Sequence, residues 1–337
     1  MAPGVSVVIV AYNNGEELLE CVESVLEHGD GAEIVVVVNG DAGGTAAKLA
    51  GRPGVTTVDA GRNSGFAGGC NLGASRAGGD VLLFLNPDAV VLPGAVAALA
   101  AAAGEPGVGI VMPRLRLRAE PERLNSAGGA IHVCGQGWAT GFRQPAADLV
   151  TRRSVAAASG AAMAVRRHLF AALGGFADEM FAYHEDAELS WRAHLRGLDV
   201  VVIPDADVLH AYEFSRHAAK FELLERNRLL FVLTCYGRRL LWLLSPVLVV
   251  YEVAVTGVAA RQGWLGAKRR GWRWLWEHRS WLRARRAEVQ GGRRVPDRTL
   301  APLLTPVLDP GMLDLPRGVA VVNVGLRAYW WAVLRLL

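Results

Sequence analysis

Three carboxylates stand within four residues near the middle of the chain, at Glu185, Asp186 and Glu188. Acidic side chains favour the first turn of a helix, where unpaired N–H groups carry partial positive charge, so the cluster predicts a helix start. A helix start alone does not account for Trp191 and Arg192 about one turn later. A carboxylate in such a cluster is also suited to accepting a proton from a hydroxyl group.

A second group of candidate ligands follows an apolar run at residues 81–85, where Asn86 and Asp88 stand. Asp88 could bind Mg²⁺ or Mn²⁺ through oxygen while the ion offsets the charge of a bound diphosphate. His210 ends another apolar run, and a neutral imidazole there could complete the metal shell. Two alternatives remain: Asp88 as a turn or helix-cap residue, and His210 as a structural residue.

A glycine-rich segment at residues 61–73 leads into a predicted helix. Backbone N–H groups at such a junction favour anions, and glycine permits close approach of a ligand. The candidate ligand-binding residues in this segment are Asn63, Gly65, Phe66 and Asn71. The segment matches neither GxGxxG nor GxxxxGK[ST], which argues against dinucleotide binding and against an ATPase P-loop. A turn without a ligand is the alternative.

The elements that must position these residues alternate along the chain. Continuous apolar runs predict strands at 5–10, 33–38, 55–58 and 81–85, with helical patterns after the first and third. This alternation predicts an α/β fold with a mainly parallel sheet flanked by helices. Open sheets of this kind bind ligands at the carboxyl edge, where the candidate polar residues follow their strands. Residues 125–148 are rich in turn formers and predict an irregular or hairpin region.

Taken together, the motifs resemble a family 2 glycosyltransferase of the inverting GT-A class, most similar to bacterial rhamnosyltransferases that use dTDP-rhamnose. The matching segments are VSVVIVAYNN, RNSGFAGGCNLG, LNPDAVV, SGAAMAVRR, LGGFADEMFAYHEDAELSWRAHLRG and ERN at 225–227. The resemblance implies the Rossmann-like fold of nucleotide-diphospho-sugar transferases over a domain at residues 1–230.

The resemblance also implies roles for individual residues. It implies that Ala11, Tyr12 and Asn13 bind the nucleotide and that Asp186 is the catalytic base. Asn86 and Asp88 correspond to the metal motif, with Asp88 as the surviving carboxylate and His210 as a further metal ligand. Glu185, Trp191 and Arg192 correspond to acceptor and diphosphate contacts.

Two positions depart from the family pattern, and one of them is Asn86, which replaces the first Asp of the metal motif. Family members carry an Asp before the Asn that ends the second strand, where it reads the pyrimidine base, and this chain has Val38 there. Asn39 or Asp41 is then the candidate for that contact.

The implied reaction transfers a sugar, rhamnose or another hexose, with inversion by direct displacement. The expected donor is a dTDP- or UDP-sugar, the cofactor is Mg²⁺ or Mn²⁺, and the acceptor is a lipid-linked or saccharide hydroxyl in cell-envelope polysaccharide synthesis. Two alternatives remain open. One is a catalytically silent, membrane-associated partner of a polysaccharide-assembly complex, which Val38 favours, and the other is a transferase acting on a soluble acceptor.

Residues 231–337 differ in composition and predict a helical, membrane-associated region. Residues 240–260 carry one charge, Glu252, and residues 261–294 hold eleven Lys and Arg against two Glu, together with five Trp. Arg mixed with Trp is typical of a membrane interface, and no nucleic-acid module accompanies the basic residues, so an anionic membrane and no nucleic acid is expected. The alternative for 240–260 is the core of a soluble homodimer.

The expected location is the cytoplasmic side of the cell membrane. The chain begins without a basic segment before its first apolar run, so no secretory signal peptide is expected. Its four cysteines stand far apart without a CxxC pair, which predicts neither a disulfide framework nor a zinc site.

Overall fold

The structure, a computed structural model, describes residues 4–40, 44–211, 218–309 and 318–337. The chain divides into two compact units. Unit 1 comprises Met1–Gly129, Ala139–Ala193 and Leu198–Glu213, and unit 2 comprises Ala130–Trp138, His194–Gly197 and Phe214–Leu337. The domain boundary expected after residue 230 stays a prediction.

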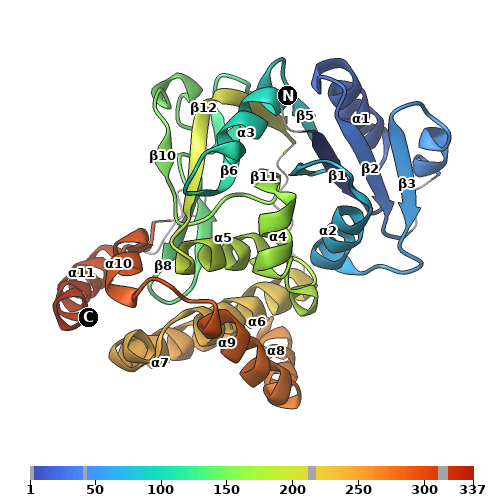
Figure 1. Ribbon diagram of the computed structural model, residues 1–337. Helices are drawn as coiled ribbons and strands as arrows, with labels where there is room; N and C mark the ends of the chain where they lie inside the picture. The colour runs from blue at the N-terminus through green and yellow to red at the C-terminus, as the bar shows by residue number, and fades with distance from the viewer. Residues whose placement is uncertain (1–3, 41–43, 212–217, 310–317) are drawn as a thin grey trace. The chain divides into compact units, whose positions relative to one another are not determined.

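Unit 1 is built on a ten-stranded sheet whose main path runs β10-β12-β6-β11-β4-β1-β2-β3 (Figure 1). Strands β1 to β4 pair in parallel, and β6 pairs in parallel with β12, whereas β11 lies antiparallel between β4 and β6. The strands of the path and its two side strands are β1 (Val5–Ala11), β2 (Glu33–Val38), β3 (Val55–Asp59), β4 (Val81–Leu85), β5 (Ala89–Val91), β6 (Val108–Leu117), β7 (Leu124–Ser126), β10 (Arg153–Ser154), β11 (Ala162–Arg166) and β12 (Asp199–His210).

The central strands form because their apolar runs suit burial on both faces of a sheet. All five residues of β4 are buried, as are all but the first residue of β1. The helices of this unit are α1 (Glu16–His28), α2 (Gly65–Arg76), α3 (Ala95–Gly104), α4 (Arg167–Leu173) and α5 (Glu185–Leu195). The mainly parallel, helix-flanked sheet that the sequence predicts is confirmed.

Strand pairing gathers the candidate ligands at one edge of the sheet. The carboxyl ends of the parallel strands β1, β2 and β4 meet there, and β12 reaches the same edge because His210 pairs with Ala89 of β5. Strand β5 follows Asp88 directly. Residues separated by more than a hundred positions in sequence therefore become neighbours.

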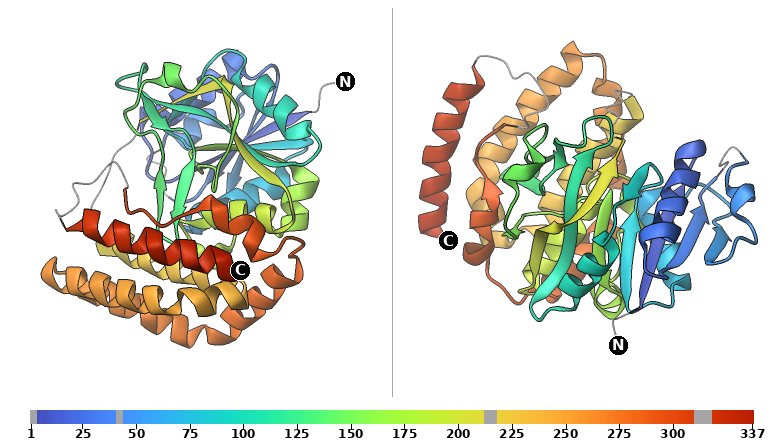
Figure 2. Two further views of the ribbon diagram at one scale, coloured as in Figure 1. Left: turned by 90° about the vertical axis from the view of Figure 1, so that its left-hand side faces the viewer. Right: turned by 90° about the horizontal axis from the view of Figure 1, so that it is seen from above.

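Unit 2 is mainly helical (Figure 2). Its helices are α6 (Ala218–Cys235), α7 (Arg238–Arg261), α8 (Leu265–Glu277), α9 (Arg279–Gly291), α10 (Asp297–Leu300) and α11 (Val319–Leu336). A three-stranded sheet, ordered β13-β8-β9, comprises β13 (Leu304–Thr305), β8 (Gly129–His132) and β9 (Gly137–Ala139). Within the described ranges, α7 and α11 are long and apolar enough to cross a membrane by length and composition. The sequence analysis anticipated α7 but not α11.

Candidate active site

The glycine-rich segment is held in place by Asn39, which directly follows β2 and is 1% exposed. Its Oδ1 accepts hydrogen bonds from the backbone N–H and the hydroxyl of Ser64, at 2.9 and 2.8 Å. Its Nδ2 donates to the Gly65 carbonyl at 2.9 Å and lies 3.3 Å from Asn63 Oδ1, which also accepts from the Gly65 N–H. Asn39 and Asn63 thus fix the turn that begins α2.

The start of α2 lies against the segment that precedes α5. The Ala67 N–H donates to the Phe181 carbonyl at 3.0 Å. A Cβ on residue 65 would lie 2.2 Å from that carbonyl oxygen, and the φ of Gly65 is +73°, so glycine is required there. Asn71 joins the same two segments, because its Nδ2 donates to the carbonyl of Phe176 and to Asp178 Oδ1, at 2.9 and 2.6 Å.

The segment before α5 has an unusual backbone. Phe181, Tyr183 and His184 have φ values of +64°, +68° and +74°. Bulky residues rarely adopt this left-handed conformation, which costs about 1–3 kcal/mol per residue. Strain of this kind persists where the surrounding contacts enforce it. In this chain the strained residues lie directly before α5.

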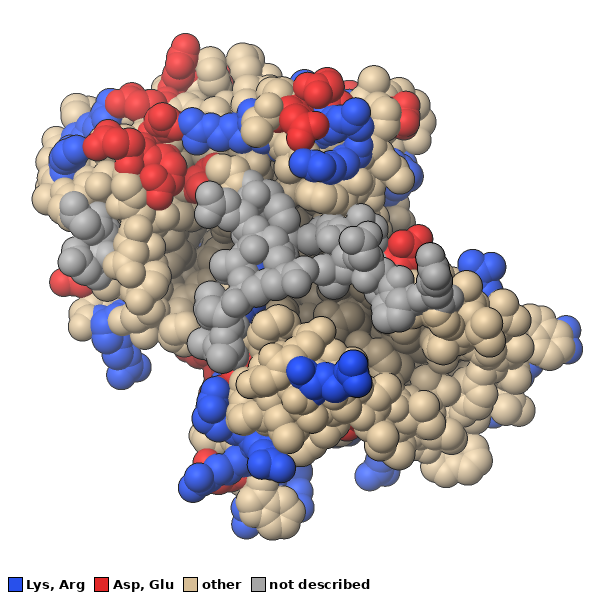
Figure 3. Space-filling model, turned by 180° about the vertical axis from the view of Figure 1, so that it is seen from behind, with Lys and Arg blue, Asp and Glu red and all other residues tan. Residues whose placement is uncertain are grey.

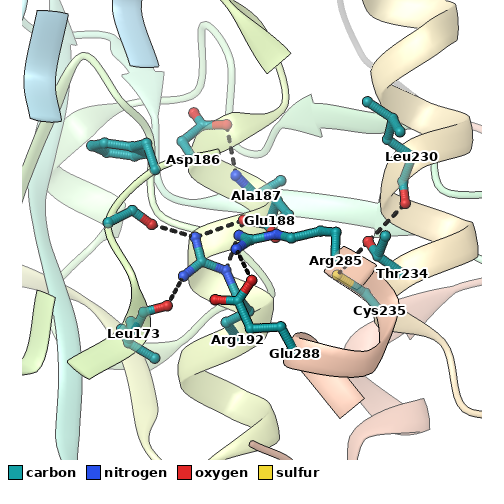
Figure 4. A network of polar contacts seen from close by, with 12 residues as sticks. Leu173, Asp186, Ala187, Glu188, Arg192, Leu230, Thr234, Cys235, Arg285 and Glu288 are labelled. Atoms are coloured by element: carbon teal, nitrogen blue, oxygen red, sulfur yellow. Dashed lines mark hydrogen bonds and ion pairs between the residues drawn. The ribbon is translucent and has the colours of Figure 1, made fainter. Parts of the chain in front are cut away.

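Asp186, in the first turn of α5, is held by two backbone donors. Its Oδ2 accepts from the Gly160 N–H at 2.9 Å. Its Oδ1 accepts from the Ala187 N–H at 2.7 Å (Figure 4). Burial of the carboxyl raises its pKa, and the two N–H donors oppose that rise. The two donors orient the carboxylate, and the residue as a whole is partly exposed.

Glu185 beside it is buried, with 5% of its surface exposed. Among the described residues its Oε2 has no hydrogen-bond partner. Burial, and then repulsion from the Asp186 carboxylate, raise the pKa of Glu185 to about 8. At neutral pH Glu185 is therefore largely protonated.

A second cluster at the same sheet edge joins Asp88 and His210. Asp88 Oδ1 lies 3.3 Å from His210 Nε2, and the Asn86 amide nitrogen lies 3.2 Å from the same atom. On the other side of the ring, His210 Nδ1 lies 3.1 Å from Asn125 Oδ1. When Nδ1–H donates to Asn125, the Nε2 lone pair faces Asp88, which is the orientation that a metal ligand needs.

This cluster fits a divalent cation that also binds a phosphate-bearing ligand. It supplies carboxylate and imidazole donors side by side. Within the part of the chain that the structure describes, no group of three or more His, Cys, Asp or Glu could hold a metal by itself. Magnesium and manganese commonly keep water and substrate phosphates as their remaining ligands, so two protein donors suffice.

The family model described as "Glycosyl transferase family 2" matches residues 6–174. The chain belongs to this family. The N-acetylglucosaminyl-diphospho-decaprenol L-rhamnosyltransferase of Mycobacterium tuberculosis is 29% identical over 232 residues, covering 60% of this chain and 75% of the relative. The O-antigen biosynthesis protein RfbC of Myxococcus xanthus is 31% identical over 157 residues, which is 44% of this chain and 12% of that protein. The resemblance to rhamnosyltransferases is thereby confirmed.

Solved structures show the same fold. GalNAc-T7, with UDP, GalNAc and Mn²⁺, superposes with a TM-score of 0.57 at 19% identity, over 69% of this chain and 48% of that one. A mannosyltransferase from Pyrobaculum calidifontis, in complex with GDP-Man and Mn²⁺, gives a TM-score of 0.51 at 18% identity, over 99% and 86%. This chain is a family 2 glycosyltransferase with the GT-A fold.

Two predicted site residues of this glycosyltransferase lie in the interior instead. Trp191 is 1% exposed, so it has no surface to offer an acceptor. Arg192 is 5% exposed and pairs with Glu188 at 2.7 Å, while its remaining donors bond to the carbonyls of Leu173 and Gly175 (Figure 4). Arg192 joins α5 to the end of α4, and contacts of Trp191 and Arg192 with acceptor and diphosphate stay predictions that their burial does not favour.

The residues expected at the nucleotide differ in exposure. Tyr12 is 49% exposed and its ring lies against Gly40, whereas Ala11 is fully buried at the end of β1. Asn13 has a φ of +53°, which turns the chain outward after the strand. Asp41 lies outside the described residues. Donor contacts by these residues, and by Asn39, Asn63, Gly65, Phe66 and Asn71, stay predictions.

Sequence reasoning missed two positioning residues. Asn125 lies in β7, in the region expected to be irregular, and orients His210. Gly160 precedes β11 and donates its N–H to Asp186. A Cβ on residue 160 would lie 3.3 Å from the Phe66 ring and 3.5 Å from Asp186 Oδ2. The sequence signal for Gly160 is the SGAAMAVRR motif, which contains it without revealing its partner.

Proposed function

We propose that this glycosyltransferase moves rhamnose or another hexose, with inversion, from a nucleotide diphosphate to an acceptor hydroxyl during cell-envelope polysaccharide synthesis. The observation that carries the proposal is the Asp186 carboxylate, fixed by the Gly160 and Ala187 N–H groups and left partly exposed. A carboxylate fixed in one orientation on a partly exposed residue is the arrangement expected of a general base.

Asp186 would accept the proton of the acceptor hydroxyl as that oxygen attacks the anomeric carbon, and the bond to the nucleoside diphosphate breaks on the opposite face. The raised pKa of Asp186 makes it a stronger base than an exposed aspartate. Glu185, protonated at neutral pH, adds no second negative charge beside it. The role of Glu185 is then to set the charge of the pair.

Asp88 and His210, with Asn86 nearby, are the residues that would hold Mg²⁺ or Mn²⁺. The ion would offset the negative charge that develops on the departing diphosphate. Asn125 keeps the His210 ring oriented for this purpose. Activity should be lost in excess EDTA and restored by Mn²⁺ or Mg²⁺, and Asp88→Ala should weaken both metal and donor binding. Full activity of the chelated enzyme would contradict the assignment.

The donor and acceptor are proposed from the relatives. The rhamnosyltransferase relative acts, by its name, on a lipid-linked diphosphate sugar, and the structural relatives hold UDP or GDP-mannose. We therefore propose a dTDP- or UDP-sugar as donor and a lipid-linked or saccharide acceptor.

A panel of nucleotide sugars tests the proposal. The full-length protein with Mn²⁺ should release nucleoside diphosphate from one or a few donors, and Asp186→Asn should bind the same donor without releasing it. A chain that binds and turns over none of the panel would be the silent partner instead. Release that is unchanged in Asp186→Asn would move the base to another carboxylate.

We also propose that the enzyme lies at the inner face of the membrane, through unit 2. Helix α7 exposes large apolar side chains, with Trp242 75% exposed and Val250 70% exposed, and α11 exposes Val321 at 77%. Tyr329 of α11 donates its hydroxyl to the Leu243 carbonyl of α7 at 2.5 Å, so the two helices lie side by side. Their exposed apolar residues suit the boundary between lipid headgroups and acyl chains.

A further inference from the structure

Unit 2 contains a cavity lined largely by arginine. Its volume is about 680 Å³. Six arginines from α7, α9, α10 and the segment after α9 line it, against one acidic side chain, Asp297. The arginines are Arg238, Arg239, Arg283, Arg286, Arg293 and Arg298.

Two of these arginines are occupied by the protein itself. Arg293 pairs with Asp297 at 2.7 Å and also donates to the Cys235 carbonyl at the end of α6. Arg286 donates to the carbonyls of Leu233 and Tyr236. Burial and the positive charges of Arg238 and Arg293 lower the pKa of Arg286. Like charges therefore lie close together in this cavity.

The other four arginines have no acidic partner among the residues that the structure describes. Arg238 and Arg239 stand in the first turn of α7, where unpaired N–H groups of a helix add partial positive charge. Arg283 comes from α9 and Arg298 from α10. These four arginines are exposed at the cavity and can donate to an anion with several oxygen acceptors, which describes a phosphate group.

The cavity opens at one end of an apolar stripe. Along α7, Arg238 and Arg239 are followed on the same exposed face by Trp242, Val249 and Val253, at helical spacing. Figure 3 shows a broad face of the helical unit that is neither acidic nor basic, with Lys and Arg at its margins. Phosphate-binding groups next to an apolar stripe match a molecule with an anionic head and a hydrocarbon tail.

We propose that this arginine cavity binds the phosphate headgroup of an anionic lipid whose hydrocarbon lies along α7. The inference rests on the proposed membrane association and goes beyond it, because it assigns headgroup recognition to a defined site rather than to overall charge. It is independent of the sugar-transfer site in unit 1.

The test compares vesicle binding by the full-length protein and two matched double variants. The cavity variant, Arg239→Gln with Arg283→Gln, removes two arginines that lack acidic partners. The control, Arg261→Gln with Arg269→Gln, removes the same charge from exposed positions of unit 2 that do not line the cavity. Vesicles contain phosphatidylcholine with or without phosphatidic acid, and inorganic pyrophosphate is titrated separately.

The wild type should prefer vesicles with phosphatidic acid, and the cavity variant should lose about tenfold or more of that affinity, because two guanidinium groups that would bond directly to the phosphate are removed. The control should lose clearly less than the cavity variant, because Arg261 and Arg269 contribute only a general attraction to the anionic surface. If both variants lost vesicle affinity equally, overall positive charge would explain the binding and the proposed cavity site would be wrong. If the protein bound pyrophosphate but showed no preference for phosphatidic acid, the ligand would be a free phosphate compound and the proposal of a lipid headgroup would be wrong. Absence of vesicle binding by the wild type would overturn the membrane association as well.

Discussion

Two groups of buried charges, one in each unit, differ in how their charge is compensated. In unit 1, Glu185 and Asp186 are adjacent, and neither pairs with a Lys or Arg in the described part of the chain. In unit 2, Lys268 and Arg228 each contact both Glu225 and Glu252, at 2.5 to 3.0 Å. In the first group, the pKa values of both carboxyls are raised. In the second group, two cations balance the charge of two carboxylates.

The contrast shows that buried charge by itself does not mark a catalytic site. The unit 2 cluster, completed by a hydrogen bond from the Trp272 indole to Glu252 at 2.7 Å, joins α6, α7 and α8. Arg228 and Lys268 lower the pKa of Glu252 despite its burial, so it stays ionised. The unit 1 pair has no such partners and is therefore able to exchange a proton near neutral pH.

Asp186→Asn should give the largest change. The substitution keeps the shape and removes the basic oxygen, so the transfer rate should fall by about 10²- to 10⁴-fold while donor binding is retained. Glu225→Gln is the matched control, because it neutralises a buried carboxylate of the paired cluster. Its turnover per folded molecule should remain at the wild-type level, and an equal loss in both variants would erase the distinction between the clusters.

Lys268→Met tests the paired cluster of unit 2. The substitution leaves Glu225 and Glu252 with one cation, Arg228. The free energy of unfolding should therefore fall by about 3 kcal/mol, which is at the lower end for a broken buried ion pair. Denaturant titration of unit 2 fluorescence measures the loss. Adding Glu225→Gln to Lys268→Met should recover part of it, and a Lys268→Met protein as stable as the wild type would show that the cluster contributes nothing.

The sequence predicted most of the fold because its signals are local. The apolar runs of β1, β2 and β4 match the predicted strands within one residue. Residues 240–260 fall within α7, and the single charge there is explained by the partners of Glu252 on α6 and α8. Local patterns carry no information on those partners, because they lie on other helices.

Local sequence signals indicated candidate site residues but not the burial of their side chains. Residue types at a sheet edge indicated Asp88, Asp186 and His210, which the fold does place at or near loop and strand ends. Trp191 and Arg192 carry equally suggestive side chains, yet helical geometry turns them inward. Asn125 was missed because its contact with His210 joins residues 85 positions apart.

Glu185→Gln should change stability and its pH dependence. The unfolded glutamate titrates near 4.5 and the folded one at about 8, so between these values the folded protein holds a proton that the unfolded chain lacks. The stabilisation that this proton gives to the folded protein is therefore lost as the pH rises from about 4.5 to about 8. Glutamine mimics the protonated form, so the variant should be more stable than the wild type by about 1–3 kcal/mol at pH 8 and equal to it near pH 4. Parallel melting curves at both pH values would contradict the raised pKa.

Asn125→Ala should give the smallest change, and it separates positioning from proton transfer within unit 1. Without the Asn125 oxygen, His210 Nδ1–H loses its acceptor and the ring no longer holds Nε2 toward Asp88. Loss of such a supporting hydrogen bond weakens metal binding by about 10-fold, so the Mn²⁺ concentration for half-maximal transfer should rise by that factor. The rate at saturating Mn²⁺ should stay close to that of the wild type, because the Asp186 carboxylate is unchanged. Asn125→Asp retains an acceptor for Nδ1–H and should restore the lower Mn²⁺ requirement. If Asn125→Ala lowers the saturated rate and leaves the Mn²⁺ requirement alone, Asn125 acts on the reacting groups and the role assigned to His210 is wrong.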